Sequence, residues 1–131
     1  EDLGSRRIKI EISKEIGDVP LDFFLMTKVI TNLIDNAAKF SPPEAPIEIT
    51  AGVVDGHLQI KVKDEGYGIP AGDLERVFNK FFRVERSQPI RGTGLGLSIC
   101  RGLVELQGGR IWLERNEDIG TTAIIEIPLK E

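Results

Sequence analysis

The stretch Asn32-Leu33-Ile34-Asp35-Asn36-Ala37-Ala38-Lys39-Phe40 decides the fold, because it carries two residue patterns with the same helical period. Apolar side chains recur at the spacing of one helix face: Met26, Ile30, Leu33, Ile34 and Ala37. Asn32, Asn36 and Lys39 follow one another at i, i+4 and i+7, which places them on a different arc of the same helix. The stretch therefore predicts a central helix with a core face and a polar face.

The polar arc allows two interpretations. The amide oxygens of Asn32 and Asn36 are neutral ligands that suit a hard cation such as Mg²⁺, which takes its remaining ligands from water and substrate phosphates. Lys39 lies one turn further on and would meet those phosphates as a point charge. The alternative is that these side chains only coat the wet side of the helix, as polar residues do on any exposed face. The rest of the chain has to distinguish the two.

Size and composition set the broad class of the protein. A chain of 131 residues with 40% hydrophobic content is long enough for one domain with a sheet packed against helices. The net charge of −4 argues against general affinity for nucleic acid. The single cysteine, Cys100, excludes an internal disulfide and lies in an apolar helical pattern, so we expect a buried thiol. The sequence has no apolar run of membrane-spanning length, so we expect no membrane contact by this domain.

The first half of the chain reads as a strand, the central helix and a hairpin. We interpret residues 1–5 as a linker remnant and residues 6–131 as one domain. Alternating Ile8, Ile10 and Ile12 predict a half-buried strand over residues 6–13. Asp22 is the expected N-cap of the central helix, which the Ser-Pro-Pro run at 41–43 ends. Strands are expected at 47–53 and 58–63, joined by a hairpin at Asp55-Gly56.

The second half contains a short helix, a longer helix and two closing strands. The short helix is expected at residues 71–79, and Phe78, Phe81 and Phe82 are expected to pack. Residues 84–90 show no period and resemble a mobile loop. The longer helix follows the glycine run at 92–97 and shows apolar residues at helical spacing: Leu95, Ile99, Leu103 and Leu106. After Gly108-Gly109 come strands at 110–115 and 121–129.

Asp64 begins a second stretch with chemical meaning, Asp64-Glu65-Gly66-Tyr67-Gly68-Ile69-Pro70, directly after a predicted strand. Two glycines around one residue let the backbone turn tightly and approach a ligand closely. An ionised carboxylate only accepts hydrogen bonds, so Asp64 would suit the exocyclic amine of adenine and would reject the carbonyl of guanine. The alternative is an ordinary acidic turn, because an Asp-x-Gly-x-Gly string alone is weakly specific.

The glycine run Gly92-Thr93-Gly94-Leu95-Gly96-Leu97 opens a helix, and unpaired N–H groups at a helix N-terminus attract phosphate. It is not a P-loop, because no Lys-Ser/Thr pair follows the last glycine. It is not a Rossmann fingerprint either, because no strand directly precedes it. Arg83, Arg86 and Arg91 lie before the run and could close over phosphates, although solvated arginines are the simpler interpretation.

Together these stretches resemble the catalytic, ATP-binding domain of sensor histidine kinases, a member of the Bergerat-fold superfamily that includes gyrase, Hsp90 and MutL. Four family boxes occur in the expected order: an asparagine box at 32–40, a first glycine box at 64–69, a phenylalanine box at 78–83 and a second glycine box at 92–97. The resemblance covers nearly the whole chain from Arg6 onward. Residues 91–113 further resemble the Kdp-type potassium sensor kinases.

The resemblance implies an α+β fold: a two-layer sandwich with a mixed, mostly antiparallel sheet, helices on one face and a flexible ATP lid. It implies that Asn36 binds Mg²⁺, that Asn32 supports the metal and phosphate region, and that Asp64 holds the adenine amine. Lys39 would contact phosphate and Arg83 would approach the γ-phosphate. It implies further nucleotide contacts from the glycine boxes and their neighbours: Phe40, Gly66, Gly68, Ile69, Gly92, Thr93, Gly94, Leu95, Gly96, Leu97 and Thr122. The assignment of Thr122 departs from the family pattern Gly-x-Gly-Thr, because Asp118 stands where its first glycine is expected.

The resemblance also favours a kinase over a hydrolase. ATPases of the superfamily carry a glutamate, the general base for water, four residues before the metal-binding asparagine, and this chain has Asn32 there. An amide does not accept a proton at neutral pH, whereas phosphoryl transfer needs mainly positioning and charge stabilisation.

Family members carry the phosphoacceptor histidine on a helical dimerisation domain, which this sequence lacks, so we expect a monomeric fragment of a cytoplasmic kinase portion. Its partners would be that helical domain and a response regulator, and its parent would be an inner-membrane sensor. Two alternatives stay open: a serine kinase of the anti-sigma type, and a non-catalytic nucleotide-sensing or docking module.

Overall fold

The computed structural model describes residues 8–13, 22–82 and 96–129. The strands are β1 (Ile8–Ile12), β2 (Ile47–Val54), β3 (His57–Asp64), β4 (Arg110–Arg115) and β5 (Thr121–Pro128). The helices are α1 (Phe23–Lys39) and α2 (Gly96–Leu106), with two short 3₁₀ turns, η1 (Ala71–Asp73) and η2 (Arg76–Phe78). The 3₁₀ turns replace the single short helix expected at 71–79.

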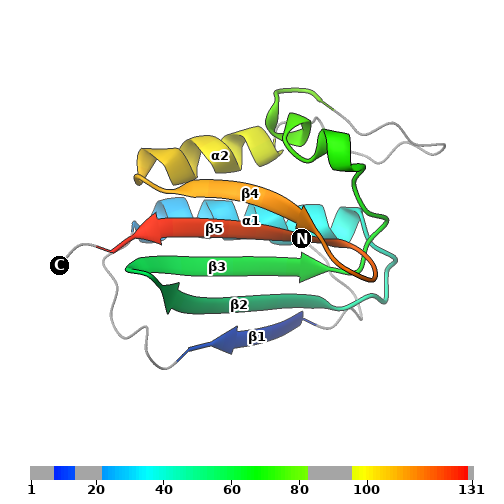
Figure 1. Ribbon diagram of the computed structural model, residues 1–131, viewed down its shortest axis with the longest axis horizontal. Helices are drawn as coiled ribbons and strands as arrows, with labels where there is room; N and C mark the ends of the chain where they lie inside the picture. Colours follow the sequence, from blue (N-terminus) through cyan, green and yellow to red (C-terminus); the bar gives the residue numbers. More distant parts are fainter. Residues whose placement is uncertain (1–7, 14–21, 83–95, 130–131) are drawn as a thin grey trace.

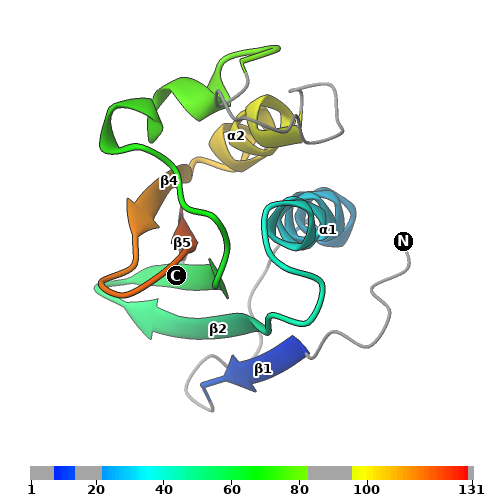
Figure 2. The same cartoon turned by 90° about the vertical axis from the view of Figure 1, so that its right-hand side faces the viewer.

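The described strands form one five-stranded sheet in the order β1-β2-β3-β5-β4 (Figure 1). β1 pairs with β2 in parallel, and the other neighbouring pairs are antiparallel. Seen from the side, α1 and α2 cover one face of the sheet (Figure 2). The expected α+β sandwich with a mixed, mostly antiparallel sheet is therefore confirmed.

Helix α1 forms where the apolar period places it. The Asp22 Oδ1 atom accepts a hydrogen bond from the Leu25 N–H at 3.0 Å, which confirms the N-cap. At the other end, the Phe40 N–H donates to the Asn36 carbonyl and the Ser41 hydroxyl donates to the Ala37 carbonyl. The fully buried face consists of Met26, Val29, Leu33 and Ala37, while Ile30 and Ile34 pack at its edge.

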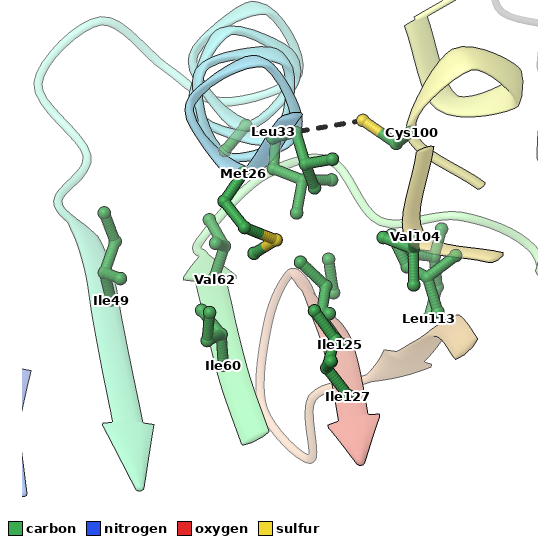
Figure 3. Close-up of a cluster of buried hydrophobic side chains, with 14 of the residues drawn as sticks. Met26, Leu33, Ile49, Ile60, Val62, Cys100, Val104, Leu113, Ile125 and Ile127 are labelled. Atoms are coloured by element: carbon green, nitrogen blue, oxygen red, sulfur yellow. Dashed lines mark hydrogen bonds between the residues drawn. The ribbon is translucent and has the colours of Figure 1, made fainter. Parts of the chain in front are cut away.

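The core lies between the two helices and the sheet (Figure 3). Even-numbered residues of β3 face the helices, and Leu58, Ile60 and Val62 are all buried there. The β2–β3 hairpin turns at Asp55 and Gly56, which both have positive φ (50° and 75°) as a primed turn requires. The predicted hairpin is thereby confirmed.

Two expectations about apolar faces were wrong. In β1, Ile8 packs against the core, but Ile10 and Ile12 are 60% and 65% exposed because β1 is an edge strand. In α2, the buried residues are Cys100 and Val104, whereas Ile99 and Leu106 are exposed. The helical period of α2 was therefore right, and Leu103 packs against the core as predicted, but the fully buried positions are Cys100 and Val104.

Candidate functional site

The polar arc of α1 is present as predicted, and its members are not equivalent. Asn32 and Asn36 are half-buried, and Lys39 is exposed on the last turn. The Lys39 Nζ atom lies 3.2 Å from Asp35 Oδ2, so the ammonium already has a carboxylate partner on its own helix. Asn32 lies beside Cys100 of α2 and lowers the pKa of its thiol slightly. The Asn32 end of the arc therefore lies beside α2.

Cys100 joins the two helices and is not a nucleophile. Its Sγ atom donates to the Val29 carbonyl at 3.6 Å, the contact drawn as a dashed line in Figure 3. Burial raises the pKa of the Cys100 thiol to about 12, and Asn32 only partly opposes that shift. The thiol stays neutral at physiological pH, so the predicted buried structural role is confirmed.

Asp64 is the best-defined polar group of the site. It ends β3 on the face of the sheet that carries the helices, because it continues the buried even-numbered series of that strand. Its Oδ1 atom accepts hydrogen bonds from the Gly66 N–H at 2.8 Å and from the Thr121 N–H at 3.1 Å. Two backbone donors thus fix the position of the carboxylate.

The loop after Asp64 is joined directly to the end of α1. The Tyr67 N–H donates to the Phe40 carbonyl at 2.9 Å. Gly66 is buried, and a Cβ at this position would lie 2.3 Å from the Phe40 carbonyl oxygen and 2.9 Å from Asp64 Oδ1. Gly68 has φ +83°, which favours glycine, and Ile69 packs against the core. The asparagine-rich helix and the glycine loop, separate in the sequence, therefore form one connected site.

Three residues of this site were missed by sequence reasoning. The Asn116 Nδ2 atom donates to the Asp64 carbonyl at 2.9 Å and to the Ile119 carbonyl at 2.8 Å. Gly120 has φ +89°, and a Cβ there would lie 2.1 Å from the Asp64 carbonyl oxygen. Thr121 is buried beside Asp64. The turn residues between the last two strands were the available signal, but only the fold brings them to Asp64.

The structure corrects the position expected for Thr122. This residue pairs with Lys63 across the sheet, on the face opposite the helices, and its hydroxyl donates to Asn116 Oδ1 at 2.6 Å. On that outer face lies an open hollow of about 650 Å³, lined by Glu48, Thr50, Lys61, Lys63, Glu114, Asn116, Glu117, Asp118 and Thr122. Because side chains alternate along a strand, the threonine on the Asp64 side is Thr121.

The second glycine box lies only partly within the described residues. Gly96 begins α2 and Leu97 packs against the core, so the glycine run does open a helix. The remaining predicted nucleotide contacts of this region lie outside the described residues: Arg83, Gly92, Thr93, Gly94 and Leu95.

The three phenylalanines of the phenylalanine box differ in burial. Phe78 is buried and Phe82 packs against the core, as expected. Phe81 is instead 67% exposed and has φ +64°, an uncommon conformation for a non-glycine residue.

The described residues limit the kind of metal site that is possible. They contain no group of three or more His, Cys, Asp or Glu side chains placed to hold a metal ion. Any cation here would therefore depend on amide oxygens and on oxygens that a ligand brings. None of the described helices combines the length and apolar composition needed to cross a membrane.

Comparison with known proteins agrees with this geometry. Residues 22–131 match the family model of histidine kinase-, DNA gyrase B- and HSP90-like ATPases. The chain is 42% identical over 117 residues to the sensor histidine kinase WalK of Bacillus subtilis, covering 86% of this chain and 19% of WalK. It is 36% identical over 133 residues to the sensor protein SrrB of Staphylococcus aureus, covering 100% of this chain and 22% of SrrB.

A solved structure gives the same result. The catalytic domain of the histidine kinase ThkA, in a nucleotide-free form, superposes with a TM-score of 0.81 at 33% identity, covering 95% of this chain and 80% of that one. The chain spans about a fifth of the length of WalK and SrrB. The family match and the structural similarity show that the chain belongs to the histidine kinase-, DNA gyrase B- and HSP90-like ATPase family. Within that family it is a catalytic domain of the sensor histidine kinase type.

Proposed function

We propose that this domain binds ATP with Mg²⁺ and donates the γ-phosphoryl group to a histidine on a separate helical dimerisation domain. The observation that carries the proposal is the fixed carboxylate of Asp64, held by the backbone amides of Thr121 and of the buried Gly66. A carboxylate in this setting accepts a ligand N–H and disfavours a ligand carbonyl. Adenine offers an amine at that position and guanine offers a carbonyl.

The adenine end of the pocket is assigned to Asp64 with Gly66, Gly68 and Ile69. Gly66 allows the backbone to pass the Phe40 carbonyl without a clash, and Phe40 closes the end of α1. Thr121 takes the place first expected for Thr122, because its amide binds Asp64 directly. These contacts are all made between described residues of the loop, the sheet and the end of α1.

The phosphate end is assigned to the polar arc of α1 and the beginning of α2. Asn36 would supply an amide oxygen to Mg²⁺, and the bound ion would neutralise charge on the transferred phosphoryl group. Lys39 would contact phosphate, which would require it to exchange or share its present partner, Asp35. Gly96 and Leu97 begin α2, where helix N–H groups favour an anion. We extend the assignment to Arg83, Gly92, Thr93, Gly94 and Leu95 by the family resemblance.

Asn32 favours transfer to a histidine over hydrolysis. Asn32 lies beside the Cys100 thiol, and an amide is not a general base at neutral pH. Water would therefore be a poor nucleophile at this site, whereas the unprotonated nitrogen of a neutral imidazole can attack without a base first removing a proton. Phosphoryl transfer then depends on positioning and charge stabilisation, which the proposed site supplies. The resulting phosphohistidine would pass its phosphoryl group to a cytoplasmic response regulator.

Transfer in trans tests the proposal. The domain is mixed with [γ-³²P]ATP, Mg²⁺ and a separately purified helical domain carrying the phosphoacceptor histidine, from the full-length parent chain or from WalK. We expect label on the helical domain that is stable to base and labile to acid, with Asn36→Asp reducing the rate at least about tenfold. Acid-stable phosphoserine would contradict the proposal in favour of a serine kinase. ATP binding without any transfer would favour a nucleotide-sensing module.

A further inference from the structure

Asn116 directly follows β4, and its side-chain amide joins the turn between β4 and β5 to the end of β3 (Figure 1). Its Nδ2 atom donates to the Asp64 carbonyl at 2.9 Å and to the Ile119 carbonyl at 2.8 Å. Its Oδ1 atom accepts a hydrogen bond from the Thr122 hydroxyl at 2.6 Å. We propose that Asn116 is a positioning residue for adenine recognition and that Thr122 acts through it from the outer face of the sheet. The inference rests on the proposed function, because it concerns how the Asp64 carboxylate is held.

The turn that Asn116 holds carries one of the two backbone donors to the Asp64 carboxylate. The Thr121 N–H donates to Asp64 Oδ1 at 3.1 Å. The Gly120 carbonyl belongs to the same planar peptide unit as this N–H, and it accepts a hydrogen bond from the Asn116 N–H at 3.0 Å. On the other side of Thr121, the Thr122 hydroxyl binds the Asn116 side chain. Contacts with Asn116 therefore fix the direction in which the Thr121 N–H points.

The same side chain also holds the main chain of Asp64. The paired residues of β3 and β5 end with Lys63 and Thr122, one residue before Asp64. Beyond that pair, the hydrogen bond from Asn116 to the Asp64 carbonyl continues the connection. Gly120 makes the close approach possible, because a Cβ there would lie 2.1 Å from the Asp64 carbonyl oxygen. One residue thus fixes the donor segment and the acceptor residue relative to each other.

These contacts need a group that donates twice and accepts once, as a side-chain amide does. Carbonyl oxygens only accept, so the amide NH₂ group has to face Asp64 and Ile119. The Thr122 hydroxyl donates to the remaining oxygen and keeps the amide in that orientation. The isosteric change Asn116→Asp would place an acceptor-only carboxylate against both carbonyls at neutral pH. Thr122→Val would preserve the shape of the side chain and remove only its hydroxyl.

Thr50 provides a matched control on the same face of the sheet. Like Thr122, it lines the outer hollow, but it lies on β2 and pairs with Lys61. Thr50→Val therefore removes a hydroxyl from the same face without touching the turn before β5. The matched ligand is purine riboside diphosphate, which keeps the ring, ribose and phosphates of ADP but lacks the exocyclic amine. A misplaced Asp64 should weaken only ADP, whereas a general loss of folding should weaken both ligands equally.

Calorimetry measures the affinity of each folded variant for ADP and for purine riboside diphosphate, both with Mg²⁺. We expect the wild type and Thr50→Val to prefer ADP by at least about tenfold, and Asn116→Asp and Thr122→Val to reduce that preference to about threefold or less. Thr122→Val is conservative enough to fold, so it decides the question even where Asn116→Asp does not fold. Retention of the full ADP preference by the folded variants, or equal losses for the two ligands, would overturn the inference. A folded wild type that binds both ligands equally, or neither, would instead refute the proposed recognition of adenine by Asp64.

Discussion

At the scale of single residues, the site depends on two glycines, Gly66 and Gly120, because there is no room for a side chain at either position. A methyl group at Gly66 would collide with the Phe40 carbonyl, and one at Gly120 would collide with the Asp64 carbonyl. Both contacts are with backbone, which cannot move aside as a flexible side chain can. The two glycines therefore let three chain segments meet around Asp64.

Gly66→Ala should destabilise the domain, because the added Cβ would stand 2.3 Å from the Phe40 oxygen. We expect a loss of about 3 kcal/mol in the free energy of unfolding, measured by urea denaturation. Gly72→Ala is the matched control, since a Cβ there meets nothing within 4 Å, and it should stay within about 0.5 kcal/mol of the wild type. Equal stability of the two variants would show that the loop does not pack on α1 as described.

Single residues also show how far the sequence could be interpreted. Asp64 and Gly66 were predicted because a carboxylate and a tight loop leave a local signature. The sequence could not predict that Thr121, and not Thr122, lies on the Asp64 side of the sheet. A shift of one residue in strand register decides which of the two side chains faces Asp64. Asn116 was missed for a related reason: its hydrogen bond reaches Asp64 across 52 residues of sequence.

At the scale of elements, the long periodic helix was the most predictable and the short segments were the least. Seventeen residues of α1 with a consistent apolar face and a capping aspartate fix both its type and its start. Residues 71–79 carry too few periodic positions to separate an α-helix from two 3₁₀ turns. The exposure of Ile10 and Ile12 depends on the place of β1 at the edge of the sheet, which alternation within one strand does not specify.

The pairing of β4 with β5 predicts a pH dependence of stability. Arg110 hydrogen-bonds Glu126 and lowers the pKa of its carboxyl group below the usual 4.5, and Gln59 adds a further hydrogen bond. The unfolded chain then binds the proton more tightly, so this stabilisation is present above pH 4.5 and is lost as the pH falls through the lowered pKa.

Urea denaturation at a series of pH values measures this effect. Glu126→Gln should flatten the fall in unfolding free energy between about pH 5 and pH 3, and Arg110→Ala should flatten it in the same way. The pair is exposed on the arginine side, so each change at neutral pH should be small. If the unfolding free energy of both variants falls with pH as steeply as that of the wild type, the Arg110–Glu126 pair is not the source of the pH dependence.

At the scale of the whole molecule, the fold creates the site by bringing distant segments to one end of the sheet. The end of α1, the loop after β3 and the turn before β5 meet at Asp64, and α2 packs beside α1 through Cys100. The order of motifs was enough to indicate the family. The strand order, with β5 between β3 and β4 and with a parallel β1, required the structure because many strand orders satisfy the same alternation.

The central claim is that this end of the sheet binds an adenine nucleotide and that Asp64 recognises the adenine base. Calorimetric titration with ADP and with GDP, each with and without Mg²⁺, tests it most directly when wild type is compared with Asp64→Asn. We predict Mg²⁺-dependent binding of ADP, at least tenfold weaker binding of GDP, and loss of ADP binding in a folded Asp64→Asn variant. Equal affinity for ADP and GDP, or unchanged ADP binding by Asp64→Asn, would contradict the account.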